Sequence, residues 1–98
     1  MEIPFPVRQY VEWIKGLFTP IPDMHPAVKS FAVDEERNNV SVFAVVHGTH
    51  TGEDGPVPPT GNKVTGDYVY VMDFEGNRIR HMTKIWNDGI ILQQLGWM

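Results

Sequence analysis

Cysteine is absent from the 98-residue sequence, which excludes disulfides, thiolate nucleophiles, cysteine-ligated zinc and iron–sulfur centres. Long apolar runs are also missing, since no stretch approaches the ~18 residues that a membrane-spanning helix needs. Basic residues are few: eight Lys and Arg stand against twelve Asp and Glu, for a formal net charge of −4. Together these features argue against a nucleic-acid or membrane partner and favour a cytoplasmic protein.

The residues that are present suffice for one small domain, which we place at residues 1–98. The hydrophobic class makes up 42% of the sequence and charged residues 20%, a composition typical of a globular chain with one core. A chain of this size buries only about 60–65% of its surface on folding. An apolar face left uncovered would therefore cost a large share of its stability.

An amphipathic helix is predicted near the start of the chain. From Pro6 to Phe18 apolar residues recur at helical spacing, with charged residues on the other side. Pro6 suits the first helical turn, and the Thr19–Pro22 run ends the helix. Tyr10 lies on the apolar stripe and Trp13 at its edge. For Trp13, packing against a neighbouring element is one reading and contact with a ligand is the other.

Four strands are predicted after the helix, because the apolar residues there follow strand periodicity and include many Val, Ile, Phe and Tyr. A polar turn, a long loop with three prolines and a tight turn at Glu75–Asn77 separate them. The fold class predicted from residue patterns is therefore α+β, a four-stranded antiparallel sheet with one N-terminal helix. The predicted strands are Ala27–Val33, Val40–His50, Val64–Phe74 and Arg78 to about Asn87.

Both faces of the two middle strands are apolar. Strands with one wet face alternate between apolar and polar residues, whereas strands covered on both faces do not. One helix of about thirteen residues, ~20 Å long, covers only one face of a four-stranded sheet. We therefore predict a homodimer in which a second copy covers the other sheet face. The residues behind this prediction include Val40, Val42, Phe43, Val45, Val69, Tyr70 and Val71.

His47 and His50 make a poor metal pair. In an extended strand, residues three apart point to opposite faces, and no third ligand stands at a recognisable spacing. His25, in a constrained connector, is either a surface residue or part of a lid. Nucleophile elbows and phosphate-binding glycine patterns are lacking as well, so neither a metal nor an organic cofactor is predicted.

The last predicted strand carries a candidate pocket wall. A row that mixes apolar and short polar groups suits a site in which a few hydrogen bonds orient an apolar ligand. The alternative is that His81 is simply hydrogen-bonded to its neighbours. Asp88 would point away from His81 in a regular strand, but Gly89 permits a bulge that could re-aim its carboxylate. The residues that share this face are Ile79, His81, Thr83, Ile85 and Asn87.

Three stretches of the sequence carry a family signature: Val46–Gly52, Pro58–Gly61, and Ile79–Met82 leading to Gln93–Gly96. Together they resemble the SnoaL-like polyketide cyclase family, within the nuclear-transport-factor-2-like superfamily. The resemblance covers roughly Phe43–Trp97 and, more weakly, the first helix. It implies a cone-like fold with a curved sheet around an apolar pocket, truncated here at the N-terminus, and dimerisation through the sheet.

The resemblance also implies a function: binding of an apolar, carbonyl-bearing small molecule and cofactor-independent proton abstraction next to the carbonyl, as in a cyclase or isomerase. The family's acid/base aspartate falls on Asn87, and an amide cannot exchange protons as a carboxylate does. Asp88 and His81 are then the candidate catalytic residues. The alternative is a non-catalytic ligand-binding or dimerisation domain. Candidate ligand contacts are Asn87, Thr83, Ile85, Trp13 and Tyr10.

Overall fold

The computed structural model describes residues 2–3 and 7–98. Its four strands form one antiparallel sheet in the order β1-β2-β3-β4. The predicted α+β class with a curved four-stranded antiparallel sheet is confirmed, whereas the role predicted for Pro6 lies outside the described residues. The elements are α1 (Val7–Leu17), β1 (His25–Asp34), β2 (Asn39–Thr49), β3 (Lys63–Glu75), β4 (Arg78–Trp86) and α2 (Asp88–Leu95).

Helix α2 corrects the prediction of a single helix. The bulge that Gly89 permits does not form; a helix starts there instead, and the Asn87 side chain accepts a hydrogen bond from the Ile90 backbone N–H at 3.4 Å. Gly96 ends the helix in the left-handed conformation, with φ of 77°. An eight-residue helix spans little more than two turns, which is too short to give a clear periodic pattern.

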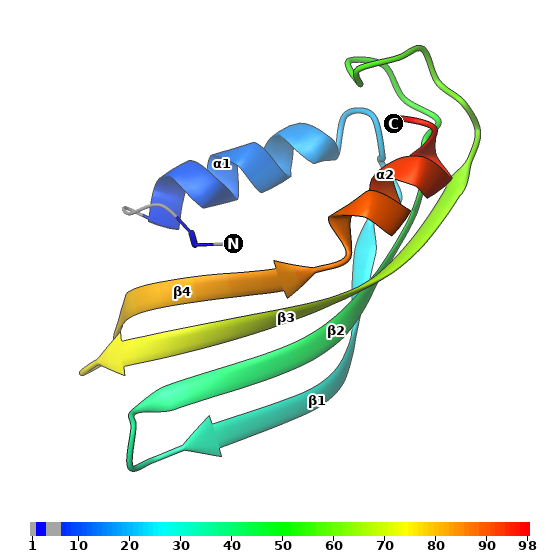
Figure 1. Ribbon diagram of the computed structural model, residues 1–98. Helices are drawn as coiled ribbons and strands as arrows, with labels where there is room; N and C mark the ends of the chain where they lie inside the picture. The colour runs from blue at the N-terminus through cyan, green and yellow to red at the C-terminus, as the bar shows by residue number, and fades with distance from the viewer. Residues whose placement is uncertain (1, 4–6) are drawn as a thin grey trace.

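Both helices lie on the concave side of the curved sheet (Figure 1). Helix α2 packs closely on β3, where Gly66 leaves room for the Ile91 side chain that an added Cβ would overlap. Helix α1 reaches the sheet through Tyr10, which packs with Met82 of β4. None of the described helices is long and apolar enough to cross a bilayer.

Two clusters form the core of the described residues. One gathers Ile21, Val64, Ile91 and Leu95, with Trp86 and Trp97 packed against it. The other gathers Ile3, Tyr10 and Met82, with Ile14 and Tyr70 packed against it. The first cluster joins α2 to β3 and to the connector after α1, and the second joins α1 to β4. Residues of both clusters border the cavity described below.

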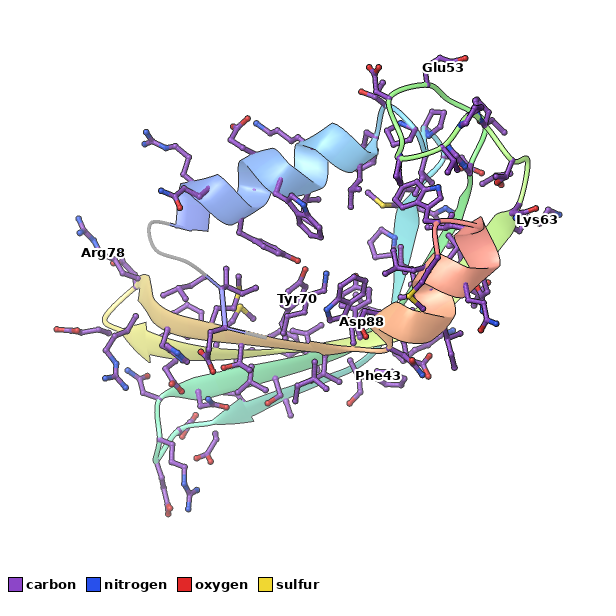
Figure 2. All side chains as sticks on the ribbon, turned by 45° about the horizontal axis from the view of Figure 1, so that its top comes forward. Phe43, Glu53, Lys63, Tyr70, Arg78 and Asp88 are labelled. Carbon is purple, nitrogen blue, oxygen red and sulfur yellow. The ribbon has the colours of Figure 1, made fainter. Side chains whose placement is uncertain are left out.

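The opposite face of the sheet carries no helix among residues 2–3 and 7–98. Phe43 points to this side, away from Tyr70 and the helices (Figure 2). Phe43 is 36% exposed and Ile85 59% exposed, although both are large apolar side chains. The structure thus shows which sheet face the helices cover, a point that the residue pattern alone left open.

His50 fixes the long loop between β2 and β3. The ring is fully buried, and Nδ1 accepts hydrogen bonds from Trp97 Nε1 at 3.1 Å and from the Thr60 backbone N–H at 3.3 Å. Because the indole N–H can only donate, the ring proton of His50 resides on Nε2. His47 lies elsewhere and stacks on His25, with 5.3 Å between the ring centroids. His50 therefore joins the loop to the C-terminal end of the chain.

Candidate functional site

An apolar cavity of about 290 Å³ lies on the concave side of the sheet, between its strands and the two helices. Trp13, Trp86 and Trp97, the only three tryptophans of the sequence, all line it. Aliphatic side chains of α1 and α2 supply much of the remaining wall: Ile14, Leu17, Ile91, Leu92 and Leu95. A cavity of this size and lining is typical of a small-molecule site.

Lys84 brings an amine into this apolar cavity. The residue is only 7% exposed, and its Nζ donates a hydrogen bond to the Tyr10 hydroxyl at 3.0 Å. Burial lowers the pKa of Lys84 from 10.5 to about 8, because the charged form loses hydration. The neutral amine, which is both basic and nucleophilic, is therefore far more populated near neutral pH than in an exposed lysine.

Among the described residues, five contribute aromatic rings that surround the Lys84 amine. Nζ lies 4.7 Å from the ring of Trp86 and 5.5–5.7 Å from four other ring centroids. These distances are within cation–π range, so the rings offset part of the cost of burying the charge. The strand register produces the arrangement, since Lys84 pairs with Tyr70 and Trp86 with Tyr68. The four other rings belong to Tyr10, Trp13, Tyr68 and Tyr70.

Two tyrosine hydroxyls extend the polar group around Lys84. Tyr10 and Tyr70 are hydrogen-bonded to each other through their hydroxyls, and Tyr70 points from the sheet toward α1 (Figure 2). Burial is the main cause that raises the pKa of both residues, and it also raises the pKa of Tyr68. The hydroxyls therefore keep their protons at neutral pH and can donate hydrogen bonds. A hydrogen-bonded chain runs from Lys84 through Tyr10 to Tyr70.

The structure brings two of the predicted ligand contacts to this cavity. Trp13 lines it, and Tyr10 contacts the lysine within it. His81, Thr83 and Ile85 are not brought there, because alternate residues of β4 point to the other sheet face. His81 contacts the Glu2 carboxylate, and its Nδ1 lies 3.8 Å from Asp73 Oδ2.

Asn87 and Asp88 lie at the start of α2. Asp88 is exposed, and its Oδ1 accepts a hydrogen bond from the Gly89 backbone N–H at 2.8 Å. A second cavity, of about 380 Å³, has Asn87, Ile85 and Asp67 among its lining residues. The catalytic assignment of His81 and Asp88 stays a prediction.

Sequence reasoning missed Lys84 as a site residue. The signal was its position in β4: it stands between Met82 and Trp86 on the side of the strand opposite to the expected pocket wall. A lysine between two large apolar residues on one strand face either reaches solvent beside them or is buried with them under another element. Lys84 is buried because it pairs with Tyr70 of β3 and because α1 brings Tyr10 into contact with its amine, and neither contact can be read from the β4 sequence.

A family model described as SnoaL-like polyketide cyclase matches residues 6–95. The chain belongs to this family. The predicted resemblance is thereby confirmed. No curated protein matches this SnoaL-like chain significantly.

Solved structures of similar proteins share the fold of this SnoaL-like chain. AclR, a candidate hydroxylase from Streptomyces galilaeus, superposes with a TM-score of 0.77 at 27% identity, over 93% of this chain and 57% of AclR. A candidate SnoaL-like cyclase from Jannaschia sp. CCS1 superposes with a TM-score of 0.76 at 21% identity, and the match covers 91% of this chain and 60% of the Jannaschia protein. IdmH, a candidate polyketide cyclase from Streptomyces antibioticus, superposes with a TM-score of 0.75 at 24% identity, and the match covers 92% of this chain and 63% of IdmH. The SnoaL-like chain thus spans less than two thirds of each of these proteins.

Proposed function

We propose that residues 1–98 act as a SnoaL-like domain that binds an apolar, carbonyl-bearing small molecule in the cavity lined by the three tryptophans. The observation that carries this proposal is the single lysine amine, buried among aromatic rings at a wall that is otherwise largely apolar. A carbonyl oxygen only accepts hydrogen bonds, and the Lys84 ammonium only donates them. The same donor stabilises negative charge on that oxygen, which is what proton removal next to a carbonyl requires.

The group that removes the proton differs from the carboxylate that the family resemblance implies. Among the described residues that line the cavity, none is Asp or Glu. His25 and the neutral form of Lys84 are the basic groups there. The proposed reaction, a cofactor-independent isomerisation or cyclisation, therefore uses a nitrogen base in a largely apolar cavity.

Binding is tested with acetophenone and ethylbenzene, a pair that differs by one carbonyl in place of one methylene. Quenching of tryptophan fluorescence reports binding, because every tryptophan lines the cavity. We expect the wild type to bind the ketone about tenfold more tightly than the hydrocarbon, as one charge-assisted hydrogen bond allows. Lys84→Met should bind both compounds equally, whereas Lys15→Met, at an exposed site on α1, should keep the preference. Equal binding by the wild type would contradict the proposal.

The alternative is a binding domain without catalysis. Exchange of the acetophenone methyl protons in deuterium oxide, followed by NMR, distinguishes this alternative from the proposed enzyme. Exchange accelerated by the wild type and lost in Lys84→Met supports proton abstraction in this cavity. Binding without accelerated exchange supports the non-catalytic function.

A second candidate site rests on the cavity next to Asn87, which Asp67 and Ile85 also line. Asp88→Asn and His81→Ala test the catalytic roles predicted from the sequence. If these two variants abolish the methyl-proton exchange and Lys84→Met does not, the reaction takes place outside the cavity that Lys84 lines.

We further propose that the outer sheet face forms a homodimer, supported by the exposed Phe43 and Ile85 and by the half-buried Val45, Val69 and Val71 around them. Phe43→Asp would place a charge in the dry interface and should weaken dimerisation at least about tenfold. Phe31→Asp is the matched control, because Phe31 is 65% exposed but pairs with Val42 on the other sheet face. Sedimentation velocity measures the dimerisation of the wild type and of both variants, and a monomeric wild type would refute the dimer.

A further inference from the structure

We infer that Lys84 reacts covalently with its ligand: its Nζ condenses with the carbonyl carbon to form a protonated imine. This inference rests on the proposed function, since it requires a carbonyl compound in the same cavity. It goes beyond that function because it assigns a covalent intermediate and names aldehydes and ketones, rather than esters or acids, as the substrates.

The position of the amine supports a nucleophilic role. Lys84 both lines the cavity and is itself buried, so a ligand that fills the cavity meets the amine at its wall. The lowered pKa of Lys84 agrees with this geometry, because only the neutral amine attacks a carbonyl. The other lysines whose surroundings are described, Lys15, Lys29 and Lys63, are exposed and stand outside the cavity lining.

The surroundings also suit the product, which keeps a positive charge at nitrogen. Ring centroids of five described residues lie within 5.7 Å of Nζ, so the rings that stabilise the ammonium would stabilise the iminium as well. The Tyr10 hydroxyl, 3.0 Å from Nζ and hydrogen-bonded to Tyr70, lies where it can stay hydrogen-bonded to the reacting nitrogen.

The steps balance without any further reactant. The lone pair of the neutral amine forms the C–N bond while the carbonyl π electrons move to oxygen, which takes up a proton as nitrogen releases one. The resulting carbinolamine takes up a second proton on its hydroxyl, the C–O bond breaks, and water leaves. The nitrogen lone pair then forms the C=N bond, which leaves the positive charge on nitrogen. That charge withdraws electrons from the neighbouring carbon and makes its protons more acidic, as the proposed proton abstraction requires.

The test uses benzaldehyde and sodium borohydride with the full chain. Reduction of the imine should leave a stable benzyl group on nitrogen, and mass spectrometry with peptide mapping should locate it on Lys84. The wild type should be labelled at Lys84 at least about tenfold faster than at Lys15, Lys29 or Lys63. Lys84→Arg, which keeps a cation but cannot form an imine, should lose this label, and Lys15→Met should keep it.

A second measurement separates failure of the inference from failure of the proposed function. Acetophenone labelled with heavy oxygen at its carbonyl loses the label whenever an imine forms and is hydrolysed, whereas simple hydrogen bonding leaves the label in place. Accelerated loss of the label by the wild type and not by Lys84→Arg supports the imine. Binding of acetophenone with neither label loss nor benzyl transfer to Lys84 overturns the imine and leaves the proposed function standing. No preference for acetophenone over ethylbenzene overturns the proposed function itself.

Discussion

Lys84→Met is expected to raise the free energy of unfolding by about 2 kcal/mol at neutral pH, although it removes a hydrogen bond. The pKa of Lys84 falls from 10.5 to about 8 on folding, which corresponds to a cost of about 3 kcal/mol for holding the charge in the cavity. Methionine fills a similar volume without that charge. The net increase in stability is smaller than this cost, because methionine cannot replace the cation–π contacts or the hydrogen bond to the Tyr10 hydroxyl.

The pH dependence of the unfolding free energy tests whether the buried charge of Lys84 causes this destabilisation. Between about pH 8 and pH 10.5 the unfolded chain keeps the Lys84 proton and the folded chain has released it, so stability rises with pH. We expect the wild type to gain about 2 kcal/mol from pH 8 to pH 10. Above pH 10 the raised pKa values of Tyr10 and Tyr70 act in the opposite direction, because the unfolded state then loses protons that the folded state retains.

Urea unfolding at a series of pH values, with stability extrapolated to water, measures this effect. Lys84→Met should show no rise between pH 8 and pH 10, and Lys15→Met, at an exposed position, should rise like the wild type. A wild type whose stability is flat over that range would show that Lys84 is hydrated in solution.

Gly52→Ala is expected to destabilise the fold by about 3 kcal/mol. Gly52 donates its backbone N–H to the Pro20 carbonyl at 2.9 Å, and an added Cβ would overlap the Thr19 carbonyl oxygen. The obstacle is backbone on both sides, so neither segment can yield by a side-chain rotation. The loop after β2 would have to move away from the connector that leads from α1 to β1.

Gly16→Ala is the matched control, because no atom of the described residues, apart from its chain neighbours and the backbone of its own helix, lies within 4 Å of the position its Cβ would take. Gly16 is in α1, where alanine should stabilise the fold by up to about 1 kcal/mol. Thermal unfolding of the two variants beside the wild type gives the comparison. Equal melting temperatures for Gly52→Ala and the wild type would mean that the loop does not pack on this connector in solution.

Most of the sheet could be predicted from local patterns. Every strand end agrees with prediction to within two residues, because alternating or continuous apolar residues and the turn residues between them specify strands locally. Helix α2 could not be predicted in this way. Its start depends on the Asn87 cap and its position on the close approach of Ile91 to Gly66, and the latter is a contact between elements far apart in the sequence.

The residues of the candidate site could likewise be predicted only in part. Tyr10 was predicted as a ligand contact from its place on the apolar stripe of the first helix, and Trp13 from its place at the edge of that stripe, where packing against a neighbour was the other reading. From His81 to Trp86 the strand pattern divided β4 into two faces correctly, but it cannot tell which of them faces the helices. Ile79 was predicted to share the face of His81, yet a register shift in the pairing with β3 breaks the alternation, and Ile79 packs with Tyr10 and Met82 instead. The choice of the His81 face as a pocket wall and the neglect of Lys84 both follow from that ambiguity.

By itself, the sequence determined the α1 helix, the strands and their turns, the lack of thiol chemistry and the family, since these depend on residue types and on spacing within short segments. Only the tertiary structure decided which side of the sheet encloses the cavity and that Lys84 is buried there among aromatic rings. The physical reason is that the hydration of an amine depends on what packs over it, and in this protein the packing residues come from α1, β3 and β4 together.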